Sequence, residues 1–423
     1  MYRSIVSAFA LSSVLFANAQ QYVHQVLVLN EGYFDWNAQQ QVVPVTLGAF
    51  DPSSGAYDQV AVIAGSRFAS DVMVEGQHIY VAADQKLLKY DKDSYDLLEE
   101  ATIAGIRKIA YWNEMILVTR GELGGLDHYF EVRSAGDLSF IDAVTPADGL
   151  IHSAEDLVVA DGKAWLGVNN SFEWGNLIGY LAVIDLQSMQ LVDQIDLGPN
   201  GSNPEKLMVT DGSIYVLNNT DFTGSTMSKI DRQDGSLQFT DHIAYNSGCG
   251  ASALVEQAGK IYFMEYAVNT LARFDLAVDA VSDTLQNNIS AYGLIEDPIN
   301  EVMYATTTDF FSSGALHVMA FDGTVLNSVP VGVSPGHLAL DVRSSTQIRP
   351  LGNGTFALFP NPATHIVFFE DFSGEYQVID ALGKPLLKGT STSYRTGIDI
   401  SDLASGLYSL RTADGRVVQF MKN

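Results

Sequence analysis

The chain has 423 residues, of which 47% are hydrophobic and 10% are aromatic, so it can bury a sizeable core. This length suits two or three domains or one large repeat fold. The formal charge is −27 at pH 7. Because so acidic a surface repels phosphate backbones and anionic lipid, we expect neither a nucleic acid nor a membrane surface as a partner.

The first 19 residues have the pattern of a secretory signal peptide. Arg3 gives a basic start, an apolar run follows, and Ala-Asn-Ala (17–19) forms a small-residue cleavage site before Gln20. The run is too short to span a bilayer, and no later run is long and apolar enough to do so. We therefore expect an exported chain without a transmembrane segment, whose first folded domain covers residues 20–342.

Short apolar strands recur along residues 20–342 at a spacing of about 40–50 residues. They are VLVLN (26–30), IYVAA (79–83), MILVT (115–119), AWLGV (164–168), IYVLN (214–218), IYFME (261–265) and VMYAT (302–306). Most are preceded by another strand and a tight turn, and are followed by a third strand that ends in Asp and by a fourth strand. This pattern predicts an all-β fold, a seven-bladed β-propeller.

The ring of repeats also has to close. The first repeat, QVLVLN (25–30), lacks an innermost strand, whereas a spare strand, GHLALDV (336–342), follows the last repeat. Left unpaired, the two ends would expose open sheet edges. We therefore predict that these two segments pair within one blade, with Leu338 and His337 on opposite faces of the closing strand.

Aromatic side chains recur in the loops that follow the second strands of the repeats. The first such loop reads EGYFDW (31–36), and similar loops are NNSFEWGN (169–176) and TTTDFFSSG (306–314). In a propeller these loops share one face with the links between blades. We therefore predict an aromatic face around the pore that binds a small-molecule ligand. Its candidate residues are Tyr33, Phe34, Trp36, Phe172, Trp174, Phe222, Tyr266, Phe310 and Phe311.

Three polar residues in or beside links on the same face are further candidates for ligand binding: Arg67, Arg120 and His152. Each candidate also has a structural interpretation. A ring can pack beneath its own loop, and a charged side chain can form an ion pair or cap a strand end.

A metal site is the alternative use of the pore. Asn30, Glu31, Asn169 and Asn218 stand where second strands end, and their oxygens could hold calcium and support a hydrolase or lactonase. The structural interpretation is that each Asn caps its strand end. The sequence contains no HExxH, G-x-S-x-G or phosphate-binding loop. We therefore predict no cofactor, no catalytic zinc and no assigned catalytic residue.

The C-terminal residues have a different pattern. Residues 343–357 read as a linker, and residues 358–423 contain alternating strands and short turns that predict a small β-sandwich. This segment contains a PNP start, a D-x-x-G-K hairpin and an I-D-I-S-x-L-x-x-G-x-Y motif. The motif residues are Pro360, Asn361, Pro362, Asp380, Gly383, Lys384, Asp399, Ser401, Leu403, Gly406 and Tyr408.

On these motifs the segment resembles the type A sorting domain of the type IX (Por) secretion system. The resemblance implies export by the type IX machinery of a Gram-negative bacterium. It also implies removal of the domain and attachment of the protein to the cell surface.

The propeller resembles the YncE-like family and, more loosely, the BtuG-type surface propellers that bind corrinoids beside an outer-membrane transporter. VLVLNEGYF (26–34) and PEKLMVTDGSIYVLNN (204–219) carry this likeness. It implies a surface-displayed, non-enzymatic binding protein, with a corrinoid as ligand and an outer-membrane transporter as partner. The alternatives are the calcium-dependent hydrolase and a purely structural or protein-binding propeller.

Overall fold

The computed structural model describes residues 20–173, 175–220, 224–244, 251–345, 358–370, 374–380, 384–391, 395–412 and 417–423. The predicted signal peptide lies outside these residues, as does most of the predicted linker. The described regular structure is all strand, apart from two short 3-10 helices, Pro146–Asp148 and Glu256–Ala258. No helix within the described ranges is long and apolar enough to cross a membrane. Residues Gln21–Arg343 form one compact unit, and the residues from Ser344 onward form another.

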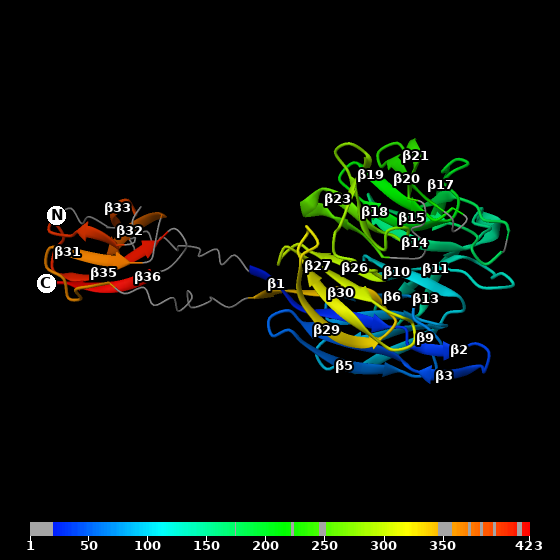
Figure 1. Cartoon of the computed structure of the whole chain (residues 1–423), viewed down its shortest axis with the longest axis horizontal. Helices are drawn as coiled ribbons and strands as arrows, with labels where there is room; N and C mark the ends of the chain where they lie inside the picture. The colour runs from blue at the N-terminus through cyan, green and yellow to red at the C-terminus, as the bar shows by residue number, and fades with distance from the viewer. Residues whose placement is uncertain are drawn as a thin grey trace, which may run out of the picture. The chain divides into compact units, whose positions relative to one another are not determined.

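The larger unit is the predicted seven-bladed propeller (Figure 1), with seven four-stranded antiparallel sheets among its described residues. From the innermost strand outward, blade 1 is β30 (Pro335–Ser345), β1 (Gln20–Asn30), β4 (Val45–Asp51) and β5 (Ala56–Ile63). Blade 2 is β6 (Asp71–Glu75), β7 (His78–Ala83), β8 (Lys86–Asp91) and β9 (Leu97–Thr102); blade 3 is β10 (Ile106–Trp112), β11 (Met115–Arg120), β12 (Phe130–Ser134) and β13 (Phe140–Val144). Blade 4 is β14 (Ala154–Ala160), β15 (Lys163–Val168), β16 (Tyr180–Asp185) and β17 (Gln190–Asp196); blade 5 is β18 (Pro204–Val209), β19 (Ser213–Asn218), β20 (Ser225–Asp231) and β21 (Leu237–Ala244). Blade 6 is β22 (Ser252–Val255), β23 (Lys260–Glu265), β24 (Thr270–Asp275) and β25 (Ala280–Thr284); blade 7 is β26 (Gly293–Asp297), β27 (Val302–Thr307), β28 (Ser313–Met319) and β29 (Val325–Val333).

Ring closure is confirmed, because β30 pairs with β1 inside blade 1. The predicted alternation along β30 is confirmed as well. Leu338 and Leu340 pack into the hydrophobic cluster between blades 7 and 1, whereas Ala339 packs between blades 1 and 2. β30 extends to Ser345, so residues 343–345 of the predicted linker belong to this strand.

The hydrophobic core of the propeller is divided among the junctions between neighbouring blades. Each junction has its own cluster of buried side chains. At the junction of blades 2 and 3, for example, Tyr80 of β7 packs with Ile109 of β10 and Val118 of β11. A second strand therefore has both of its faces buried, which explains why these strands are the continuous apolar runs seen in the sequence.

The C-terminal unit is a small β-sandwich. One sheet pairs β31 (Ile366–Glu370) with β34 (Arg395–Asp399). The other has the order β33 (Pro385–Ser391), β32 (Gly374–Asp380), β35 (Gly406–Thr412) and β36 (Val417–Lys422). Val367 and Ile398 of the first sheet share a buried cluster with Phe420 of the second, so the two sheets enclose one core.

Candidate functional site

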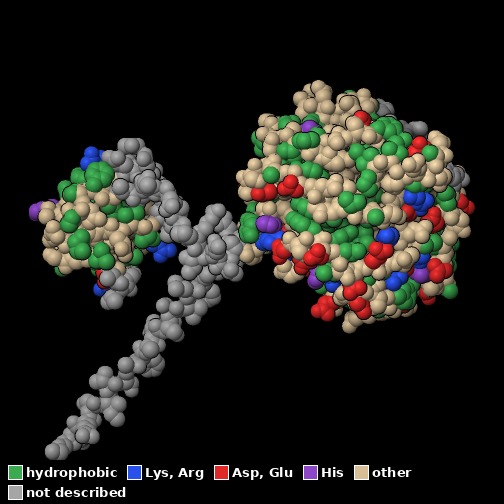
Figure 2. All heavy atoms as spheres, turned by 90° about the horizontal axis from the view of Figure 1, so that it is seen from below, with side chains coloured by type: hydrophobic (Ala, Val, Ile, Leu, Met, Phe, Trp, Pro, Cys, Tyr) green, Lys and Arg blue, Asp and Glu red, His purple; other side chains and the backbone are tan. Residues whose placement is uncertain are grey.

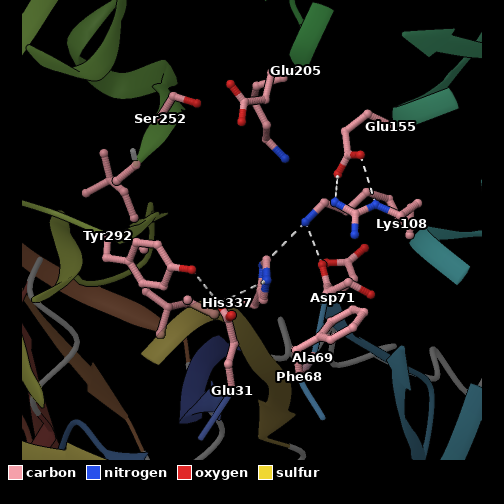
Figure 3. A pocket seen from close by; sticks show the side chains of 18 of the residues that line it. Glu31, Phe68, Ala69, Asp71, Lys108, Glu155, Glu205, Ser252, Tyr292 and His337 are labelled. Atoms are coloured by element: carbon pink, nitrogen blue, oxygen red, sulfur yellow. Dashed lines mark hydrogen bonds and ion pairs between the residues drawn. The ribbon is translucent and has the colours of Figure 1, made fainter. Parts of the chain in front are cut away.

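The centre of the propeller holds a polar cavity, here called the pore cavity, of ≈ 360 Å³, a size found in small-molecule sites. Every blade contributes to it from, or next to, its innermost strand (Figure 3). Its polar and charged lining consists of Glu31, Ser70, Asp71, Arg107, Lys108, Glu155, Glu205, Lys206, Ser252, Tyr292 and His337.

Local backbone irregularities place the charged residues of blades 3, 4 and 5 at the pore. The pairing of β10 with β11 shifts register between Ile106 and Ile109, around Arg107 and Lys108. Corresponding shifts occur in β14 around residues 155–156 and in β18 around residue 205. A β-bulge bends its strand and redirects side chains. The bulges therefore allow otherwise apolar strands to present charged groups at the pore.

Two of the basic side chains in the pore are paired with acids. Arg107 donates from Nε and Nη2 to the two carboxylate oxygens of Glu155, at 2.9 and 2.7 Å. Burial raises the pKa of Glu155, but the charge and hydrogen bonds of Arg107 outweigh it and hold the pKa below its usual value. Lys206 Nζ lies 3.2 Å from the carboxylate of Asp156. These pairs fix the wall formed by blades 3, 4 and 5.

Glu31 stands on the opposite wall and is not paired in this way. The Tyr292 hydroxyl donates to Glu31 Oε1 at 2.7 Å, and His337 Nε2 lies 3.9 Å from the same oxygen. Burial raises the pKa of Glu31 to about 7, although Tyr292, Lys108 and Arg107 all act to lower it. Glu31 therefore changes charge near neutral pH.

His337 is uncharged at neutral pH. Burial lowers its pKa well below the usual value, and the nearby positive charges of Lys108, Lys206 and Arg107 lower it further. Lys108 Nζ lies 3.5 Å from His337 Nδ1 and donates to the carbonyl oxygen of Ser70 at 2.5 Å.

A second cavity, here called the rim cavity, is lined by residues of blades 1 to 4 and the links between them. Three residues predicted from the sequence line it, namely Trp36, Arg67 and Phe172, together with Phe68, Leu123 and Arg107 among others. Asp84 orients Arg67 by accepting from Nε at 2.8 Å and from Nη2 at 2.5 Å. The Arg67 guanidinium lies 5.3 Å from the Trp36 ring and 5.7 Å from the Phe68 ring, which is within cation–π range.

The predicted aromatic residues of blades 1 and 7 lie close to one another. Phe34 contacts Trp36 at a ring-centroid distance of 4.8 Å, and Tyr33 contacts Phe311 at 5.2 Å. Phe310 contacts the pore residue Tyr292 at 5.0 Å. Trp36 is 55% exposed and Phe311 is 65% exposed, so these rings present apolar surface to the solvent as well as to each other.

Other predicted ligand-binding residues lie away from both cavities. The Arg120 side chain is only 6% exposed, contacts Glu131 at 3.4 Å and donates to the carbonyl oxygen of Ala104, so it has a structural role. His152 lines neither cavity. Tyr266 stands beyond β23 and is 36% exposed. Trp174 and Phe222 lie outside the described residues.

The predicted calcium ligands are used for other contacts. Asn30 is fully buried and donates to Thr46 Oγ1 at 3.1 Å, and Asn218 donates to two hydroxyls of β20 at 2.8 and 3.1 Å. Asn169 accepts from the backbone N–H two residues on, at 3.1 Å. Asn30 and Asn218 make these contacts through their side-chain N–H groups, and within the described residues their buried Oδ1 atoms accept no hydrogen bond. Of the four predicted ligands, Glu31 lines the pore cavity and the three Asn do not. Within the described ranges, no three His, Cys, Asp or Glu side chains are grouped to hold a metal ion.

Most residues of the pore cavity were not predicted from the sequence. One sequence pattern could have indicated this cavity. Two adjacent charged residues stand at the same place in three successive innermost strands: RK (107–108), ED (155–156) and EK (205–206). Each pair interrupts an otherwise apolar strand. Tyr292 and His337 belong to single blades and had no such signal.

The sorting motif is built around the last strand. The Asn361 side chain accepts from the N–H of Met421 at 2.8 Å and donates to the carbonyl oxygen of Gln419 at 3.3 Å. It lies between Pro360 and Pro362, so the PNP segment borders β36. Asp380 accepts from the backbone N–H of Lys384 at 2.9 Å. Gly406 opens β35, and the Tyr408 hydroxyl donates to the carbonyl oxygen of Ala404 at 2.8 Å. Gly383 lies outside the described residues.

Comparison with known families agrees with this C-terminal arrangement. Residues 357–422 match the family of the secretion system C-terminal sorting domain. The match indicates secretion by the type IX system and a location outside the cell or at its surface. A search of curated proteins found no significant match.

Solved structures similar to the chain have propeller-like folds. AztD from Citrobacter koseri is 12% identical with a TM-score of 0.50, and the alignment covers 77% of this chain and 100% of AztD. A quinonprotein alcohol dehydrogenase-like protein from Bacteroides thetaiotaomicron is 14% identical with a TM-score of 0.55. This alignment covers 76% of this chain and 79% of that protein. A hypothetical selenium-binding protein from Sulfolobus tokodaii is 9% identical with a TM-score of 0.56. This alignment covers 78% of this chain and 94% of that protein. At these identities the similarity shows the fold alone. The chain is thus a secreted protein in which a propeller-like fold precedes a type IX sorting domain.

Proposed function

We propose that the protein is a surface-displayed, non-enzymatic propeller that binds a small organic ligand with a flat apolar part at the rim cavity. One observation carries the proposal. Trp36, Arg67 and Phe172 come from three separate segments, were selected from the sequence as ligand candidates, and line one cavity.

The chemistry of the rim cavity favours a flat, conjugated ligand. Aromatic faces and the Arg67 guanidinium can stack on such a ligand, while Leu123 and Ile106 add apolar surface. Because Asp84 already neutralises and orients Arg67, the guanidinium can act as a stacking surface without carrying an unpaired charge. A corrinoid has this chemistry and is the specific candidate. An outer-membrane transporter is then the partner that would receive it.

The sorting domain supports the location in this proposal. Export would use the type IX machinery of a Gram-negative bacterium, followed by removal of the domain and attachment of the propeller to the cell surface. Mass spectrometry of surface material is expected to find peptides of residues 20–342 without those of residues 358–423. Intact C-terminal residues on the surface protein would contradict this part of the proposal.

Ligand binding is tested by calorimetry and thermal shift with the mature chain against cobalamin, haem and a panel of glycans. We expect saturable binding of a flat conjugated ligand. Trp36→Ala and Arg67→Ala should each weaken it by about tenfold or more, since central aromatic and Arg residues dominate binding energy. Phe140→Ala is the matched control, because Phe140 is exposed on the outer strand β13.

Two results would contradict a role of the rim cavity. One is unchanged affinity in both rim variants, and the other is the absence of binding by every conjugated ligand tested. Loss of binding in Phe140→Ala as well would show that the effect does not depend on the cavity.

A further inference from the structure

We propose that the pore cavity is a binding site for a primary ammonium group, held at the wall formed by Glu31 and Tyr292. The proposal concerns the pore cavity and does not depend on a ligand in the rim cavity, although Phe68 and Arg107 line both.

The balance of charge in and next to the pore cavity is negative. The basic side chains are Arg107, Lys108 and Lys206. The acidic side chains are Glu31, Asp71, Glu155, Asp156 and Glu205. Arg107 is held by Glu155, and Lys206 is held by Asp156. The acids therefore outnumber the bases by five to three. Burial raises the pKa of both Asp71 and Glu31, so the excess negative charge develops as these two groups ionise, which favours a cation over an anion.

The surroundings of the pore reinforce this preference. The whole chain carries a formal charge of −27, and Figure 2 shows Asp and Glu side chains spread over the visible propeller surface. A surface field of one sign raises the local concentration of ligands of the opposite sign and speeds their association. A cationic ligand is therefore attracted before it reaches the pore.

The wall at Glu31 suits an ammonium group in particular. The carboxyl group of Glu31 and the hydroxyl oxygen of Tyr292, 2.7 Å apart, face the cavity together (Figure 3). Both have lone pairs that can accept N–H bonds. The aromatic rings of Tyr292 and Phe68 also line the cavity and can attract a cation through their faces. His337 is neutral and so does not repel the ligand.

A metal ion fits this wall less well than an ammonium group. Within the described part of the chain, no three His, Cys, Asp or Glu side chains are grouped as a metal site. A quaternary ammonium ion carries the same charge but has no N–H to donate to Glu31. A primary ammonium group combines the charge with three hydrogen-bond donors, so it should bind more tightly than a quaternary one.

Binding should depend on pH with a definite sign. The groups that face Glu31 are Tyr292, which directly precedes β26, His337 from β30, and Arg107 and Lys108 from β10. An ammonium group binds the carboxylate form, and the pKa of Glu31 in the free protein is about 7. The competent fraction therefore rises from pH 6 to pH 8, and affinity should rise roughly tenfold over this interval.

The test is calorimetry of the mature chain with n-butylamine hydrochloride and, for comparison, tetramethylammonium chloride. Titrations at pH 7 in two buffers of different ionisation enthalpy report proton release. We expect n-butylamine to bind with release of a fraction of one proton, and tetramethylammonium to bind more weakly. Glu31→Gln should weaken n-butylamine at least tenfold and abolish proton release. Glu75→Gln removes an exposed acid at the end of β6 and should behave like the wild type.

A second variant keeps the test decisive if Glu31→Gln does not fold. Tyr292→Phe retains the carboxyl group but removes a hydrogen bond that stabilises its charged form, so the pH midpoint of binding should move upward. The proposal is overturned if n-butylamine does not bind or if it binds Glu31→Gln equally well. Trp36→Ala should leave n-butylamine binding intact, which separates this outcome from failure at the rim cavity.

Discussion

Glu31 links the charge of the pore to the stability of the fold. Its pKa is raised from 4.5 to about 7, so between these values the folded protein holds a proton that the unfolded chain has lost. Stability therefore falls as pH rises through this window. Between pH 5 and pH 8, the ionisation of Glu31 should lower the free energy of unfolding by about 2–3 kcal/mol.

Glu31→Gln should remove this contribution, because the amide does not titrate. Urea unfolding of the wild type and the variant at pH 5 and pH 8 checks it. The variant should gain stability relative to the wild type at pH 8, and the difference should shrink at pH 5. The same difference at both pH values would show that the Glu31 carboxyl does not titrate in this window.

Single residues of the rim were easier to predict than those of the pore. Trp36 and Phe172 are large rings in loops, a combination that stands out in a sequence. His337 and Tyr292 meet Glu31 only because distant blades converge on one axis, and the sequence gives no distances between blades. The bulge at Arg107 and Lys108 depends on strand register, which local sequence specifies poorly.

At the scale of elements, one buried carboxylate joins the closing strand to its neighbours. Asp341 of β30 accepts from Lys92 Nζ at 3.2 Å, from Gln25 Nε2 at 3.1 Å, and from Arg343 Nε at 2.9 Å. The side chain of Asp341 is fully buried, and that of Lys92 is 7% exposed. Asp341→Ala leaves Lys92 buried without its partner and should cost about 3–5 kcal/mol of stability.

The control for this prediction is Asp283→Ala, which removes the partner of Arg273 at an exposed ion pair, where Asp283 is 49% exposed. Its cost should stay under about 1 kcal/mol. Denaturant unfolding of both variants gives the comparison. Equal losses would mean that Asp341 does not anchor the closing strand. The Asp341 effect should fade at acid pH, since hydrogen bonds from Arg343, Gln25 and Lys92 hold its pKa below the usual value against the opposing effect of burial.

Elements with a repeated local cause were predicted well. Five of the seven third strands end in Asp. This Asp accepts from backbone N–H groups of the following turn, as at Asp51 and Asp231, each at 2.8 Å. Such turns can be recognised from a few residues. The hairpin of β2 (Tyr33–Asp35) and β3 (Gln40–Val43) was expected as a loop. It has no counterpart in the other blades among the residues that the structure describes.

At the scale of the whole molecule, repetition made the fold predictable. Each four-stranded unit leaves apolar surface on both faces, and only a closed ring buries all of it. The number of units and the spare strand could therefore be obtained by counting. The residues that line the pore could not be predicted by counting, because they differ from one repeat to the next.

The closing strand should determine the stability of the whole propeller. β30 lies next to β1, whose Val26, Leu27, Val28 and Leu29 are fully buried. A chain that ends at residue 335 loses this strand, which opens the inner edge of blade 1 and uncovers the clusters on both sides of it. A chain that ends at residue 345 keeps β30 and loses only the segment that follows. Thermal unfolding should show a much lower midpoint for the first chain, together with aggregation through the exposed edge. Equal midpoints would mean that β30 does not hold the ring closed, and that the convergence of seven blades on the pore does not depend on this strand.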